Sequence, residues 1–348
     1  MRVTVLTISG RAGENTIVEV WARRQALAAG AAGVQVDLAT PRMPLALTLR
    51  ALRRRRDFDL LHVHGIPAAE ALRHARLDVP VVVSVYGPDV FGAAKRSDAS
   101  GAAKAGEPAP PPPCPGLSCA RLTLAGSEGA AALARTRGAR ETRVVHLGAE
   151  LPTRTPRSLL RQSDLGQTPT LVTAGRLSAR KRHADVLRAL AVLAERHPGL
   201  RYLVIGAGPE RIAIEGLACR LGVAERVQIT GALPQEQTIE RVRSCTVFVM
   251  PSTEEAFGVA YLEAMAAGVP AIGCRGEPGP EEIAAAGDGF VLVPPGDVER
   301  LCQRIDELIS DPHRLREAGQ HARETVTEHF TWKRCGEQTA QAYEDALR

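Results

Sequence analysis

The sequence has 348 residues, of which 45% are hydrophobic and 3% aromatic, and its formal net charge is +5. This length predicts two domains or one large one, with cores built from Ala, Val, Leu and Ile. The sequence has no dense basic helix, no aromatic stacking platform and no zinc-finger spacing, which argues against a nucleic-acid-binding protein despite the positive net charge.

The N-terminal segment predicts a buried strand, because the apolar run Met1–Ile8 is too short for a membrane span and lacks a cleavage-like segment. The seven cysteines are odd in number and scattered, which favours a reduced, cytoplasmic protein. Cys114 and Cys119 form a lone C-x4-C without a second ligand pair, so a zinc site is not expected.

Short β-branched runs alternate with helical stretches along the chain, which predicts α/β domains with parallel sheets and right-handed crossovers. The expected strands of the first half are Val3–Ile8, Val34–Leu38, Leu60–Val63, Val81–Val85, Leu122–Ala125 and Arg143–His146. Those of the second half are Thr170–Thr173, Arg201–Ile205, Val227–Ile229, Val247–Met250, Ala271–Gly273 and Gly289–Val293.

A polar link at residues 151–156 divides these strands into two Rossmann-like domains, 1–151 and 152–331. We expect the last helix, 332–348, to pack back on the first domain. Residues 1–155 carry 21 Lys and Arg against 13 Asp and Glu, whereas 156–348 carry 23 against 26. Open parallel sheets bind ligands beyond the carboxyl ends of their strands, so the chemistry is expected in a cleft that both domains face.

In the first domain, polar and glycine residues follow the expected strands. Gly10 and Gly13 lie after the first strand and would let a diphosphate or an acceptor approach the backbone. His64 ends the third strand, where ligands bind, while His62 lies further back on the same face and is interpreted as structural. The pair Asp57 and Asp59 precedes that strand rather than ending it, which argues against a metal-binding D-x-D motif.

The four arginines of 53–56 follow an expected helix, Leu45–Arg56. They are either a solvated helix terminus, favoured by the helix dipole, or a contact with an anionic membrane surface or lipid-diphosphate acceptor.

The strongest signal of the second domain lies between residues 251 and 270, after an apolar strand. Gly258 marks the turn into a helix, and the N–H groups near Phe257, Gly258 and Val259 form a helix start that suits a phosphate. Glu255 lies on the preceding loop, and Glu263 on the helix can accept hydrogen bonds from ribose hydroxyls.

This stretch resembles the glutamate–seven–glutamate motif of the retaining GT-B-fold glycosyltransferases of family 4, which are also described as glycosyl transferases group 1. Glu255 and Glu263 match the two glutamates, with Phe257-Gly258 between them. The resemblance implies that the first glutamate lies against the donor sugar and that the second binds the ribose. It covers residues 171–308 densely.

Upstream, Gly175-Arg176 and Lys181 resemble the Gly-Arg-Leu…Lys element of the family. A leaving nucleoside diphosphate gains negative charge, which two fixed cations stabilise without a metal. Lys181 is one of only four lysines beside 40 arginines, which favours a specific need for the ammonium group.

Two further donor-side loops fit the family. Gly206 belongs to a Gly-x-Gly-Pro turn, and Arg211 replaces the third glycine that a dinucleotide fingerprint needs, which argues against a dehydrogenase. Gly231 and Leu233 resemble the loop whose backbone reads the donor base.

On the acceptor side the resemblance is thinner. Tyr86 stands where the family usually has histidine, and Asp89 follows it in the same turn. Because a phenol does not act as a base near neutral pH, any base role would fall to His64, Asp89 or the donor phosphate.

The resemblance implies a glycosyltransferase that moves a hexosyl or N-acetylhexosaminyl group, with retention of configuration. The donor would be a nucleoside-diphosphate sugar, and the acceptor a glycan, a lipid-linked molecule or a small metabolite. No metal or other cofactor and no nucleic-acid partner are expected, and the location would be cytoplasmic or peripheral at the inner membrane face. A 2-epimerase-like enzyme and a sugar-nucleotide-binding protein without transfer remain alternatives.

Overall fold

The computed structural model describes residues 1–6, 17–39, 45–52, 57–75, 77–86, 112–151 and 168–348. Their contacts divide into two compact units, which are described separately. The first comprises Met1–Leu147 with Trp332–Arg348, and the second comprises Gly148–Thr331. Gly10, Gly13, Asp89 and the arginines 53–56 lie outside the described residues.

The first unit contains a six-stranded parallel sheet in the order β2-β1-β3-β4-β5-β6. Its strands are β1 Arg2–Leu6, β2 Gln35–Ala39, β3 Leu60–His64, β4 Val81–Val85, β5 Leu122–Ala125 and β6 Thr142–Val144. Its helices are α1 Ile17–Ala31, α2 Leu45–Leu52, α3 Ile66–Leu72, α5 Glu128–Thr136 and α13 Trp332–Leu347, with a 3₁₀ turn, η2, at Pro115–Cys119.

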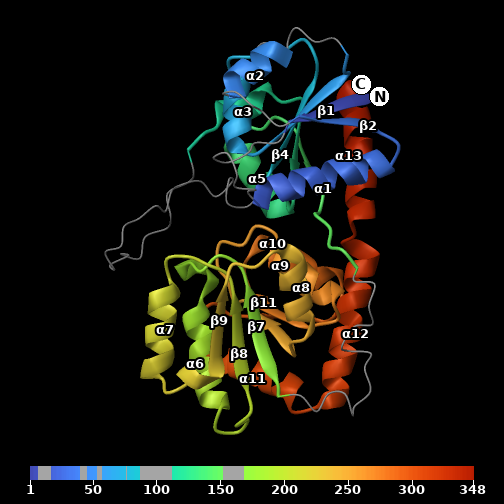
Figure 1. Ribbon diagram of the computed structural model, residues 1–348. Helices are drawn as coiled ribbons and strands as arrows, with labels where there is room; N and C mark the ends of the chain where they lie inside the picture. The colour runs from blue at the N-terminus through green and yellow to red at the C-terminus, as the bar shows by residue number, and fades with distance from the viewer. Residues whose placement is uncertain (7–16, 40–44, 53–56, 76, 87–111, 152–167) are drawn as a thin grey trace. The chain divides into compact units, whose positions relative to one another are not determined.

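The last helix, α13, packs against α1 within the first unit (Figure 1). Gly336 makes this close approach, since a Cβ placed there would lie 2.2 Å from the Ala28 carbonyl oxygen. The buried Gln25 of α1 donates from Nε2 to Thr339 Oγ1 of α13, 3.0 Å away. Two residues 314 positions apart in the sequence thus meet in the first unit.

The second unit repeats the architecture with a parallel sheet in the order β12-β11-β10-β7-β8-β9 (Figure 1). Its strands are β7 Thr170–Ala174, β8 Arg201–Ile205, β9 Val227–Gly231, β10 Val247–Val249, β11 Ala271–Cys274 and β12 Phe290–Val293. Its α-helices are α6 His183–Leu193, α7 Arg211–Arg220, α8 Gln235–Arg243, α9 Val259–Ala266, α10 Pro278–Ala286, α11 Val298–Ile309 and α12 Pro312–His329. Two 3₁₀ turns complete it, η5 Ala179–Lys181 and η6 Ala224–Arg226.

Both cores are aliphatic. Among the described residues, each unit has a cluster of mainly Leu, Val, Ile and Ala side chains buried between its sheet and helices. Strands such as β3 and β4 are buried along their whole length, as expected for parallel sheets covered on both faces. Both units thus have the doubly wound parallel sheet predicted from the sequence. Of the helices that the structure describes, none combines the length and the apolarity needed to cross a bilayer.

The strand order places one switch point in each sheet, where successive strands diverge to opposite sides. In the first unit it lies between β1 and β3, and in the second between β7 and β10. Ligands of open α/β sheets bind beyond the carboxyl ends of the strands at such a point. We therefore expect a ligand-binding or catalytic site at the loops after β3, β7 and β10.

Candidate donor and acceptor sites

The second unit brings Lys181 and Glu255 together across its switch point. Lys181 ends η5 after strand β7, and Glu255 lies on the loop after β10. Lys181 Nζ is 2.5 Å from Glu255 Oε2, and the two side chains are only 9% and 13% exposed. Two residues that the sequence assigns to one site therefore form a largely buried ion pair.

The surroundings of this pair keep Glu255 ionised. Ser252 Oγ donates to Glu255 Oε2 at 3.1 Å, and Arg180 lies 3.6 Å from the same oxygen. Burial raises the pKa of Glu255, but the charges of Lys181 and Arg180 and the hydrogen bonds from Lys181 and Ser252 together lower it by more, so the pKa lies below its ordinary value. Burial also lowers the pKa of Lys181, and the charge of Glu255 opposes that shift.

Arg176 lies just after β7 with an exposed side chain. It makes no hydrogen bond or ion pair with another residue that the structure describes. Its guanidinium, which no described carboxylate neutralises, is available to an anionic ligand.

Two glycines allow the loops at the same edge of the sheet to pack closely. Gly206, after β8, has a φ of 149°, and a Cβ placed there would lie 1.8 Å from the Gly175 carbonyl oxygen. Gly175 has a φ of 156°, and its own Cβ would contact the Lys181 side chain at 3.6 Å. The two loops thus pack backbone against backbone, which only glycine permits.

Gly258 is the N-cap of α9 with a φ of 96°. A Cβ there would lie 2.4 Å from the ring of Tyr261, whose hydroxyl is 3.0 Å from Ser252 Oγ. The glycine therefore has a packing reason in this structure, besides any approach of a ligand. Phe257 and Val259 flank it and are buried.

Glu263 lies on α9 and accepts a hydrogen bond from Gln235 Nε2 of α8 at 2.5 Å. Gln235 follows the β9–α8 loop, which carries Leu233 after Gly231 with its φ of 78°. Glu263 is thereby linked to the loop that the sequence assigns to the donor base. Gln235 was missed in the sequence, because a polar residue at a helix start also serves as an ordinary surface residue.

The first unit has a neutral polar network on β3 and β4, beside its own switch point. His64 Nδ1 lies 2.7 Å from the Tyr86 hydroxyl, and His62 Nε2 lies 2.9 Å from Ser84 Oγ. The hydroxyls of Ser84 and Tyr86 both donate to Gln25 Oε1, each at 3.2 Å. Each hydroxyl oxygen therefore accepts a hydrogen from its histidine ring.

This arrangement determines where the ring hydrogens lie. His62 donates from Nε2 and accepts from the Tyr343 hydroxyl at Nδ1, 2.7 Å away, so both of its nitrogens are bonded. His64 donates from Nδ1, which leaves a lone pair on Nε2. That nitrogen is buried and makes no hydrogen bond with any described residue.

Both histidines are neutral at pH 7. Burial lowers the pKa of His64 from 6.5 to about 3, and burial together with the neighbouring His64 lowers that of His62. Gln25, Ser84 and Tyr343 were missed in the sequence as members of this network, because they come from α1, β4 and α13 and no local pattern connects them.

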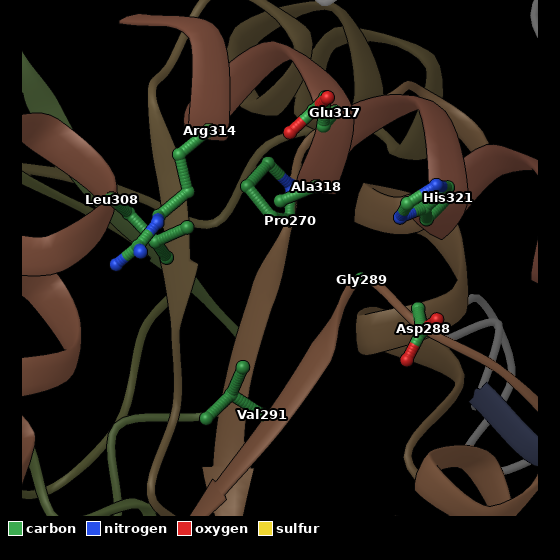
Figure 2. Close-up of a pocket in the computed structure, with 9 residues that line it drawn as sticks. All are labelled: Pro270, Asp288, Gly289, Val291, Leu308, Arg314, Glu317, Ala318 and His321. Carbon is green, nitrogen blue, oxygen red and sulfur yellow. The ribbon is translucent and has the colours of Figure 1, made fainter. Parts of the chain in front are cut away.

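The second unit also has a cavity of about 250 Å³ at the opposite edge of its sheet (Figure 2). Pro270 and Gly289, which precede β11 and β12, lie in its wall with Arg314 and His321 of α12. It therefore lies at the amino ends of the strands, away from Lys181 and Glu255. Among the residues given a position, no group of three or more His, Cys, Asp or Glu side chains could hold a metal ion.

Comparison with known proteins places the second unit in a family. Residues 159–325 match the family model described as glycosyl transferases group 1. The second unit is a glycosyl transferases group 1 domain. The Lys181–Glu255 pair and Glu263 lie inside the matched range.

Two curated relatives match about half of this chain. A GDP-mannose-dependent alpha-(1-6)-phosphatidylinositol monomannoside mannosyltransferase of Mycolicibacterium smegmatis is 32% identical over 184 residues, which are 51% of this chain and 48% of that enzyme. An exopolysaccharide phosphotransferase of Streptomyces coelicolor is 34% identical over 180 residues, 51% of this chain and 19% of that protein. The matches thus span half or less of these relatives.

The fold extends over nearly the whole chain. The crystal structure of Anabaena HepE in complex with UDP and glucose has a TM-score of 0.74 and 18% identity, covering 98% of this chain and 99% of that one. This similarity supports the GT-B architecture of both units.

Proposed function

We propose that the protein is a glycosyltransferase that moves a hexosyl or N-acetylhexosaminyl group from a nucleoside-diphosphate sugar to an acceptor hydroxyl, with retention of configuration. The observation that carries the proposal is the buried Lys181–Glu255 pair at the switch point of a glycosyl transferases group 1 domain. Relatives that use GDP-mannose or that bind UDP support a nucleotide-sugar donor and leave its base open.

The donor's diphosphate would lie beside Arg176 and Lys181 and the start of α9. As the bond between the anomeric carbon and the diphosphate oxygen breaks, its electron pair moves to that oxygen. Fixed cations stabilise this charge, an effect worth about 10²–10³-fold in rate for one such group. Glu255 would orient the sugar, and Glu263 would accept hydrogen bonds from the ribose.

The acceptor hydroxyl would attack the same face of the sugar and pass its proton to the departing diphosphate. Because this route needs neither a metal ion nor a protein base, we propose that the reaction is independent of both. His64 Nε2 would accept a hydrogen bond from an acceptor hydroxyl, because Tyr86 and Gln25 hold its lone pair in place.

We propose that the acceptor is a glycan, a lipid-linked molecule or a small metabolite. The mannosyltransferase relative named above acts on a phosphatidylinositol mannoside, which supports testing lipid-linked acceptors first. A peripheral contact with the inner membrane face would accompany such an acceptor. Vesicle cosedimentation with and without anionic lipid tests this point.

The direct test of the function is a thermal-shift screen with UDP, GDP and their sugars, followed by product analysis with EDTA present and absent. A ligand at about one hundred times its dissociation constant adds about 2.7 kcal/mol of stability. We expect stabilisation by one nucleotide series and transfer that EDTA does not reduce. Conversion of the donor without an acceptor would favour an epimerase-like enzyme, and binding without turnover would favour a binding protein.

A further inference from the structure

Glu277 contacts the donor-site loop from a neighbouring strand. It follows β11 and is the N-cap of α10. Its Oε2 accepts the backbone N–H of Glu255 at 2.8 Å, and its carboxylate also accepts the backbone N–H of Glu254. A single side chain therefore satisfies two consecutive amide groups of the loop that carries Glu255.

The loop needs such support because its backbone is strained. Glu254 has a φ of 57°, a left-handed conformation that costs a residue with a Cβ about 1–2 kcal/mol. Residues persist in such conformations only where their surroundings hold them there. Arg180 provides a second restraint. Its backbone oxygen accepts the Thr253 N–H at 2.9 Å, and its guanidinium donates to the backbone carbonyl oxygen of Glu254 at 3.3 Å.

The start of α10 also packs against the next turn of the loop. A Cβ at Gly279 would lie 2.1 Å from Phe257 Cα, so the two backbones are in direct contact. Glu277 and Gly279 thus hold the segment on both sides of Glu255.

Burial and the neighbouring carboxylates of Glu254 and Glu255 both disfavour the ionised form of Glu277. Burial raises the pKa of Glu277, and the charges of Glu255 and Glu254 raise it further. The two backbone N–H groups oppose this effect and stabilise the anion. Glu277 therefore tolerates two neighbouring acids because of the backbone groups that it accepts.

We infer that Glu277 is a positioning residue that holds the backbone of Glu254 and Glu255 so that the Glu255 carboxylate faces Lys181 and the donor sugar. The inference rests on the proposed function. Glu277 acts through Glu255 and does not itself touch the donor.

The test is a double-mutant cycle with Glu277→Ala, Glu255→Ala and both changes, measured as kcat and KM for the nucleotide sugar. Glu277→Ala should lower kcat about 10–100-fold, since a misplacement of about 1 Å can cost about 10²-fold. Its dissociation constant for UDP or GDP should stay within about threefold of the parent. In the Glu255→Ala background it should have no further effect.

Two variants serve as controls. Glu277→Gln keeps an oxygen that accepts the Glu255 N–H, so it should recover most of the lost kcat. Glu281→Ala removes a carboxylate of the same helix that accepts the Gly276 N–H at 2.8 Å and should behave like the parent. Equal losses in Glu281→Ala and Glu277→Ala, or additive losses in the cycle, would overturn the inference.

Hydrogen–deuterium exchange over Ser252–Phe257 tests the same inference without activity. Exchange should be faster in Glu277→Ala than in the parent and in Glu281→Ala, and unchanged exchange would refute the positioning role. If the parent converts no nucleotide sugar but exchange accelerates as expected, the proposed function fails while the positioning of the loop stands.

Discussion

The two units share a doubly wound parallel sheet but carry different side chains at and beside their switch points. In the second unit the loops after β7 and β10 meet in a charged pair, Lys181 with Glu255. In the first unit the ends of β3 and β4 carry His64 and Tyr86 in a neutral network that Gln25 closes. The same fold thus presents charge at one sheet and hydrogen-bonding groups at the other.

The two sets of side chains suit different ligands. A buried cation beside a carboxylate can exchange that partner for a diphosphate, which brings its own negative charge. A buried neutral imidazole without an opposite charge has a depressed pKa, about 3 for His64, and so offers a hydrogen-bond acceptor to a hydroxyl.

The largest effect is expected from Lys181→Ala. It should lower transfer about 10²–10³-fold and abolish stabilisation by nucleoside diphosphates. It should also destabilise the second unit by about 3 kcal/mol, because the buried Glu255 carboxylate then keeps only the more distant Arg180 as a described cation, beside its hydrogen bond from Ser252. Steady-state rates and urea unfolding measure both effects. Lys333→Ala, which removes an exposed lysine of α13, should match the parent.

Acid should destabilise the protein through its buried histidines. Their folded-state pKa values lie below 6.5, about 3 for His64 and about 4 for His183, so the unfolded chain binds protons first as the pH falls. The contribution of these neutral histidines to the free energy of unfolding is fully present above about pH 6.5. It is lost as the pH falls below this value, by up to about 1.4 kcal/mol per histidine per pH unit.

Urea unfolding between pH 8 and pH 5 measures this loss. In His64→Gln the free energy of unfolding should fall less steeply with pH, because one of the buried histidines no longer contributes to the loss. A parent whose stability stays constant to pH 5 would contradict the neutral network.

Two tyrosine variants compare the two histidines of the network. Tyr86→Phe and Tyr343→Phe each remove a hydroxyl that contacts a buried imidazole, at a cost of about 1–3 kcal/mol. Only Tyr86→Phe should also lower transfer, because it frees the ring of His64 to change tautomer. Unfolding and acceptor KM are the measurements, and equal effects on transfer would remove His64 from the acceptor site.

The smallest effect on stability is expected from Arg176→Ala, because the side chain is exposed and makes no polar contact with another residue of the described ranges. Unfolding should change by less than about 0.5 kcal/mol. Affinity for UDP or GDP should nevertheless fall about tenfold, or about 1.4 kcal/mol, as measured by calorimetry. An unchanged affinity would leave Lys181 as the cation that binds the diphosphate.

Much of the fold was predictable from the sequence, because buried parallel strands are continuous β-branched runs. All twelve expected strands occur, and Val81–Val85, Leu122–Ala125 and Arg201–Ile205 have the predicted bounds. The helix start at Gly258 was also predictable, since glycine there needs a positive φ.

The side-chain partners were not predictable to the same degree. The sequence assigns Lys181 and Glu255 to one site, but their direct pairing depends on the register of two loops 74 residues apart. Tyr343 meets His62 across 281 residues, and Glu277 supports Glu255 through backbone groups that no side-chain motif encodes. Contacts of this kind follow from tertiary packing rather than from local spacing.

The most direct test of the account is a crystal structure of the protein soaked with UDP or GDP. We expect diphosphate oxygens within hydrogen-bonding distance of Arg176 and Lys181, and ribose hydroxyls at Glu263. Nucleotide density in the cavity of Figure 2, at the amino ends of the strands beside Arg314 and His321, would contradict it.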